Sequence, residues 1–143
     1  MKVVVINSLD TLCFDALAVQ HDMDIVHIQA SEHTVAQTMI QAHRPDVVIF
    51  RQDDTALEIN GLIHQLFIQM PETKSVVLAS QAPTLELIKQ TGYTVRGYIL
   101  PEHIPMLEKA IRVVYEGEVW FSRKFVAALI AQLAQINIHQ SAA

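Results

Sequence analysis

An arginine ends a short apolar run in the segment RPDVVIFRQDD, residues 44–54. Val47 to Phe50 are all apolar, which predicts a short strand buried on both faces. Arg51 follows at the carboxyl end of this strand, where ligands and reacting groups lie in open α/β sheets. Its guanidinium can imitate a lysine and bind an anion there, or pair with the nearby carboxylate of Asp53 or Asp54. A third alternative is that Arg51 only extends into solvent.

A second group with chemical potential is the tetrapeptide WFSR, Trp120 to Arg123, which precedes a long apolar segment. Ser122 is a sound N-cap, and a helix N-terminus with a hydroxyl and free N–H groups favours a phosphate. Arg123 supplies a planar guanidinium with several donors, and Trp120 supplies an apolar wall. In the competing interpretation Trp120 is a core anchor and Ser122 is only a cap.

Other chemistry finds little support in the sequence. The seven histidines form no HxH or HxxxH pair, and neither a glycine-rich phosphate loop nor a GxSxG elbow is present. We therefore expect neither an enzyme nor a metal site. The net charge of -5 makes this chain alone a poor DNA binder. The single cysteine, Cys13, fits a reducing cytoplasm, and no apolar stretch approaches membrane-spanning length.

Strand-like and helix-like segments alternate along the chain. The expected strands are 2–6, 24–28, 46–50, 75–79 and 97–100. Segments of helical period lie between them, and a fifth follows Pro101 and stops at Gly117. Five such units with buried, Val- and Ile-rich strands predict a parallel α/β sheet covered on both faces.

A sixth helix is predicted over 123–137, beyond this five-unit plan. It carries a continuous apolar stripe: Phe125, Val126, Leu129, Ile130, Leu133 and Ile136. The stripe must pack on its own domain or on another chain. Because the chain is 51% apolar with a mean hydropathy of +0.27, we expect a homodimer through Phe125, Leu129, Ile130 and Leu133.

Three segments carry a family resemblance: RPDVVIF, TKSVVLAS and VRGYILPEHIPMLEKAIRVVYEGEVWFS. They resemble the receiver domains of response regulators, in the LuxR/NarL branch where a helix-turn-helix follows the receiver. The resemblance implies a flavodoxin-like (βα)5 doubly wound sheet of order 2-1-3-4-5 with an extra C-terminal helix. We expect a receiver-like domain at 1–118, the extra helix or linker at 119–138 and a tail at 139–143. DNA would be bound only through an output domain outside this chain.

The same resemblance predicts a degenerate phosphorylation site. The two acids that bind Mg²⁺ fall on Asn7 and Ser8, and the phosphate acceptor falls on Arg51. The hydroxyl and lysine that read the phosphoryl group fall on Ala79 and Pro101. A hard cation needs carboxylates and the acceptor must be a carboxylate, so we expect neither Mg²⁺ nor phosphate. The alternative is a shifted register, with Asp53 or Asp54 as the acceptor of an ordinary response regulator.

Two further positions follow from the resemblance. Tyr98 matches the aromatic residue of the fifth strand, and we expect it to be a fixed surface side chain. WFSR fits the W-[FLM]-[ST]-R motif of the VpsT/CsgD-like biofilm regulators, which implies cyclic di-GMP binding by Trp120, Ser122 and Arg123. Ile130 falls where that subset pairs its sixth helices. The alternative function is a ligand-free module for dimerisation or protein interaction.

Overall fold

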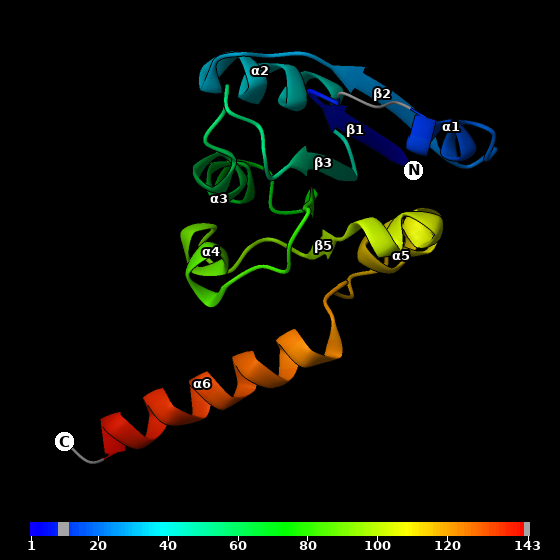
Figure 1. The fold of residues 1–143 in the computed structure, drawn as a ribbon. Coiled ribbons are helices and arrows are strands. Elements are labelled where there is room, and N and C mark those ends of the chain that lie inside the picture. The colour runs from blue at the N-terminus through cyan, green and yellow to red at the C-terminus, as the bar shows by residue number, and fades with distance from the viewer. Residues whose placement is uncertain (9–11, 142–143) are drawn as a thin grey trace.

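The computed structural model describes residues 1–8 and 12–141, which form a five-stranded parallel sheet of order β2-β1-β3-β4-β5 (Figure 1). The strands are β1 (Lys2–Ile6), β2 (Asp24–Ile28), β3 (Val47–Arg51), β4 (Lys74–Leu78) and β5 (Gly97–Ile99). Each agrees with its predicted range to within one residue at either end. The predicted fold class and strand order are confirmed.

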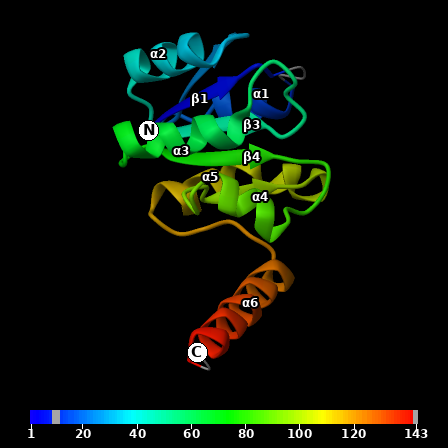
Figure 2. The ribbon, with the colours of Figure 1, turned by 90° about the vertical axis from the view of Figure 1, so that its left-hand side faces the viewer.

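Helices cover both faces of this sheet (Figure 2). One face carries α1 (Leu12–Ala18) and α5 (Leu107–Tyr115), and the other carries α2 (His33–His43), α3 (Ile59–Gln69) and α4 (Leu85–Gln90). Strand side chains alternate between the two layers, so Val48 and Phe50 pack on one side and Val47 and Ile49 on the other. The whole apolar run before Arg51 is therefore buried.

The segment after β5 begins differently from the single helix expected after Pro101. Residues Pro101–Met106 form a 3-10 turn, and the α-helix starts only at Leu107. Pro101 and Pro105 have no N–H group to donate, which disfavours a regular α-helix over this stretch. None of the helices in the described part of the chain is long and apolar enough to cross a membrane.

The sixth helix, α6 (Arg123–Ser141), extends away from the sheet and its covering helices in both views (Figures 1 and 2). It runs past the predicted end at residue 137. The segment that leads to it is joined to the sheet by a backbone bridge between Trp120 and Gly97 of β5. The last contact with the sheet therefore lies beyond residue 118, where we placed the end of the receiver-like domain. A Cβ on Gly97 would lie 3.2 Å from the Cβ of Trp120, so a glycine allows this close approach.

Candidate functional site

Arg51 is the last residue of β3, where it pairs in register with Leu78 of β4. Its side chain is only 19% exposed. Nε donates to the carbonyl oxygen of Asn7 at 2.7 Å, and Nη1 donates to Oδ1 of Asp53 at 2.9 Å. Of the alternatives for Arg51, the structure shows pairing with a local carboxylate. The Asp53 side chain is 78% exposed, so this ion pair is weak.

Asn7 connects the ends of three strands. It has a left-handed backbone conformation (φ 53°), which asparagine tolerates better than most residues. Its Nδ2 donates to the carbonyl oxygen of Ala30 at 2.7 Å and to Oδ2 of Asp54 at 2.8 Å. Its Oδ1 accepts from the Ala30 N–H at 2.8 Å. Both polar atoms of the amide are therefore already bonded within the protein.

Asp54 is buried at 8% exposure and shapes the loop after β3. Its Oδ1 accepts from the backbone N–H groups of Ala56 at 3.0 Å and Leu57 at 3.3 Å, while Oδ2 accepts from Asn7. Both carboxylate oxygens are thus engaged in holding the loop. Asp54 lies beyond the end of β3, and the structure gives it a structural role.

Three other residues assigned to the degenerate site border the same crevice. Ser8, Ala79 and Pro101 line, with Arg51, a hollow of about 400 Å³ at the carboxyl ends of the strands. Ala79 is buried directly after β4, and Pro101 opens the 3-10 turn after β5. The structure therefore brings to one edge of the sheet all five positions that the family resemblance assigns to the site.

WFSR joins this body to α6. The backbone N–H of Trp120 donates to the Arg96 carbonyl, and the backbone carbonyl of Trp120 accepts from the Tyr98 N–H, each at 2.9 Å. The indole packs against the core next to α5 and meets the His103 ring edge-on. Ser122 accepts from the Phe125 N–H at 3.1 Å, which confirms it as the N-cap of α6. Arg123 is exposed and forms no ion pair with any residue that the structure describes.

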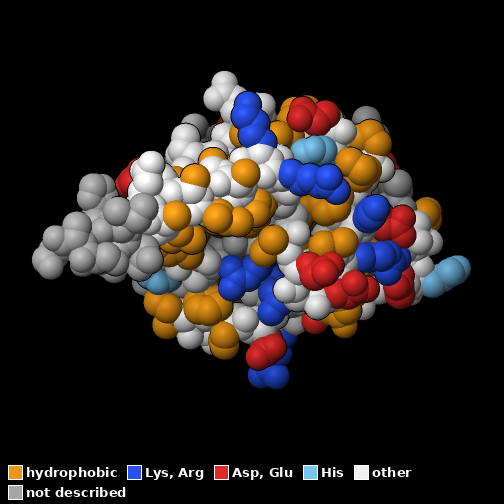
Figure 3. Space-filling model, turned by 90° about the horizontal axis from the view of Figure 1, so that it is seen from below, with side chains coloured by type: hydrophobic (Ala, Val, Ile, Leu, Met, Phe, Trp, Pro, Cys, Tyr) orange, Lys and Arg blue, Asp and Glu red, His pale blue; other side chains and the backbone are white. Residues whose placement is uncertain are grey.

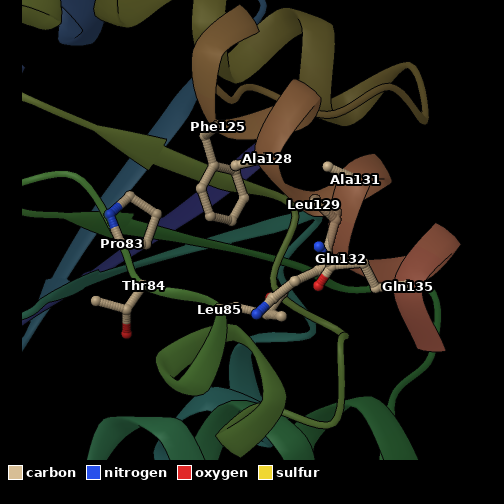
Figure 4. A pocket seen from close by; sticks show the side chains of 9 residues that line it. All are labelled: Pro83, Thr84, Leu85, Phe125, Ala128, Leu129, Ala131, Gln132 and Gln135. Atoms are coloured by element: carbon tan, nitrogen blue, oxygen red, sulfur yellow. The ribbon is translucent and has the colours of Figure 1, made fainter. Parts of the chain in front are cut away.

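The predicted dimer stripe divides between two sides of α6. Phe125 and Leu129 face back toward α4 and, with Pro83 and Leu85, line a groove between α6 and the segment that starts α4 (Figure 4). Ile130 and Leu133 are instead exposed, at 61% and 52%. The sequence pattern could not separate these two sides, because both belong to one wide apolar stripe.

Known proteins resemble this chain in sequence and in fold. No family model matches the chain. The oxygen regulatory protein NreC of Staphylococcus epidermidis is 31% identical over 116 residues, which are 78% of this chain and 51% of that protein. The chain thus spans about half the length of the curated relative that it matches.

Solved structures share the fold. A LuxR-family two-component response regulator from Aurantimonas sp. SI85-9A1 has a TM-score of 0.72 at 11% identity, covering 93% of this chain and 97% of that chain. The isolated REC domain of RcsB from Salmonella enterica serovar Typhimurium has a TM-score of 0.70 at 16% identity, covering 92% and 98%. The chain has the fold of a response-regulator receiver domain.

The residues of this receiver domain do not fit the Mg²⁺ that the fold family implies. A hard divalent cation needs several oxygen ligands, mostly carboxylates. Here the Asn7 amide is bonded to Ala30 and Asp54, and the partly buried cation of Arg51 lies against the Asn7 carbonyl. A second positive charge beside that guanidinium would be repelled. No group of three His, Cys, Asp or Glu side chains suited to a metal occurs in the described residues.

Tyr98 lies in the core of the receiver domain, so our expectation of a surface aromatic was wrong. Its ring is 3% exposed and is covered by Phe121, which in turn contacts Phe125 of α6. The sequence could not reveal this cover, because it comes from the segment that leads into the sixth helix. The phenol oxygen is buried without a hydrogen-bond partner among the described residues. Burial raises the pKa of Tyr98 to about 12.

We predict that Tyr98→Phe leaves stability at pH 7 within about 1 kcal/mol of wild type, because it removes an unsatisfied buried hydroxyl. The Tyr98 phenol ionises near pH 10 in the unfolded chain, whereas in the folded protein it stays protonated until about pH 12. Stabilisation from this group is therefore complete below pH 10 and is lost as the pH rises through about 12. Urea unfolding at pH 7 and at about pH 12 should show that the variant loses less stability than the wild type on going to the higher pH. A large loss at pH 7 would mean that the hydroxyl is hydrogen-bonded.

Proposed function

We propose that this receiver domain works without phosphorylation, as the regulatory part of a LuxR-type transcription regulator in the cytoplasm. The observation that carries the proposal is Arg51, which ends β3 at the position that the family resemblance gives to the phosphate acceptor. Its guanidinium is bonded to the Asn7 carbonyl and to Asp53. Contact with DNA would belong to an output domain outside this chain.

Incubation with acetyl phosphate and Mg²⁺ should give no phosphoryl adduct in an intact-mass measurement. The physical reason is that the guanidinium of Arg51 is not a nucleophile for this chemistry. The nearby buried acid, Asp54, already accepts hydrogen bonds on both oxygens, from Asn7 and from the loop after β3. A receiver with an intact acid pocket, treated in parallel, supplies the positive control. Stoichiometric labelling of the wild type, lost in Asp53→Asn or Asp54→Asn, would contradict the proposal.

The second part of the proposal is a homodimer through the outward face of α6. Ile130 and Leu133, on that face, are 61% and 52% exposed on the single chain. Residues 125–138 contain no charged side chain, which is unusual for a helix that projects into water. Figure 3 shows hydrophobic side chains gathered near the grey C-terminal end of the molecule. A self-complementary apolar face of this kind suits a two-fold dimer.

The third part of the proposal is cyclic di-GMP binding at the start of α6. Arg123 and Lys124 are exposed in a first turn that contains no acid. The unpaired N–H groups and dipole of the helix N-terminus add to their positive potential. This end of the helix therefore favours a phosphate, and the Arg123 plane is available to stack on a guanine. Two copies brought together by α6 would present two such ends.

Calorimetry should detect cyclic di-GMP binding with micromolar affinity, roughly −8 kcal/mol. We expect Arg123→Ala to abolish this binding without loss of fold, because exposed side chains contribute little to stability. Lys124→Ala is the matched control and should weaken binding only a few-fold through lost electrostatic attraction. Equal losses in the two variants would indicate nonspecific attraction of an anion rather than a built site.

A ligand-free interaction module is the second candidate function. Trp120 and Ser122 both have structural roles that need no ligand, since the indole is packed in the core and the hydroxyl caps α6. Only Arg123 is left without such a role. If the wild-type dimer shows no heat with cyclic di-GMP well above micromolar concentration, this second function is the one supported.

A further inference from the structure

The crevice that contains Arg51 is a hollow with mainly apolar walls. It lies at the carboxyl ends of β3, β4 and β5, where open α/β sheets bind their ligands. Leu78, Ala79, Ile99, Pro101 and Ile104 form its apolar wall, and polar groups come from Ser8, Gln52, Asp53 and Ser80. Arg51 is the only basic side chain among the described residues that line it. Its volume of about 400 Å³ is near the lower end of the range for small-molecule sites.

The wall residues decide which ligand suits this hollow. Alanine and proline stand at the positions where the family resemblance places a hydroxyl and a lysine. Without that hydroxyl and lysine, a phosphate or a hydrated cation bound against the apolar wall would lose water without full compensation. A small organic molecule with an apolar body would instead remove Ile99, Pro101 and Ile104 from water.

Arg51 determines the charge of that ligand. Its Nε bond to the Asn7 carbonyl fixes the guanidinium at the rim, and its contact with Asp53 is an exposed pair that a competing carboxylate can replace at low cost. Its Nη2 group makes no hydrogen bond with the described residues. Guanidinium groups bind carboxylates with two parallel hydrogen bonds, which adds geometric specificity.

We propose that this hollow binds a small carboxylic acid. The carboxylate pairs with Arg51 in place of Asp53, and the hydrocarbon body lies against Ile99, Pro101 and Ile104. Such a site is separate from the cyclic di-GMP site at Arg123, and it would give a receiver without phosphorylation chemistry a small-molecule input at the same crevice.

Ligand-observed saturation-transfer NMR on the full chain tests this site with benzoate and hexanoate as probes. Benzamide and hexanamide, which have similar shapes and no charge, are the matched ligands. We expect binding of the acids and at least tenfold weaker binding of the amides, since only the acids pair with Arg51. Arg51→Gln should weaken acid binding at least tenfold, and Ala79→Leu should block it by filling the hollow.

Arg123→Gln is the control variant, because it removes an arginine from the other proposed site and should leave acid binding unchanged. Circular dichroism and thermal melting test whether each variant is folded. If Arg51→Gln does not fold, the test of the site rests on whether Ala79→Leu blocks acid binding. The proposal is overturned if neither acid binds at millimolar concentration, if acids and amides bind alike, or if Arg123→Gln is as defective as Arg51→Gln. None of these results depends on whether cyclic di-GMP binds.

Discussion

Ile130→Glu should convert the protein from a dimer to a monomer at tens of micromolar. Ile130 is 61% exposed on the outward face of α6, so on a single chain the substitution replaces a hydrated apolar surface and costs little. In a two-fold dimer the same change buries two carboxylates against an apolar partner helix. We expect the dissociation constant to rise at least a hundredfold, about 2.8 kcal/mol.

Light scattering and sedimentation over a concentration series measure this constant. Gln132→Glu is the matched control, because it adds the same charge two residues away on the side of α6 that lines the groove facing α4. It should leave the dimer intact. A wild type that is monomeric throughout, or equal effects of the two substitutions, would show that the outward face of α6 is not the dimer contact.

The sequence predicted the sheet well because its central strands β1, β3 and β4 are buried on both faces. A strand with a continuous apolar run such as Val47–Phe50 can be recognised locally, and short connections between strands and helices then limit the topology. Even the gathering of Asn7, Arg51 and Pro101 at one edge follows from the parallel order, since every strand ends on the same side.

The interactions within that edge could not be predicted in the same way. The bond between Asn7 and Asp54 joins residues 47 positions apart and depends on a left-handed backbone at Asn7. The cover over Tyr98 depends on a segment, distant in the sequence, that folds against β5 only in the assembled domain. A local signal existed for Asp54, because an aspartate two or three residues before free backbone N–H groups commonly caps them.

The same bonds make Asp54 the most sensitive position of the crevice. Asp54→Ala removes an acceptor from the Asn7 amide and from the N–H groups of Ala56 and Leu57. The bonds with Asn7 and Leu57 are buried, and the bond with Ala56 is partly buried. Lost hydrogen bonds to a charged group cost more than neutral ones, and the donors left behind add their desolvation penalty. We expect the free energy of unfolding to fall by about 3 kcal/mol, with a melting temperature lower by roughly 10 °C.

Asp53→Ala is the matched comparison, since it removes the neighbouring carboxylate, which is 78% exposed and, among the described residues, forms its ion pair with Arg51. Its effect should stay within about 0.5 kcal/mol, as for most exposed ion pairs. Urea denaturation of both variants with and without Mg²⁺ separates two views of the crevice. If protein groups alone hold the ends of β1 and β3 together, Mg²⁺ changes neither curve. Stabilisation of the wild type by Mg²⁺ that disappears in Asp54→Ala would instead identify Asp54 as a metal ligand.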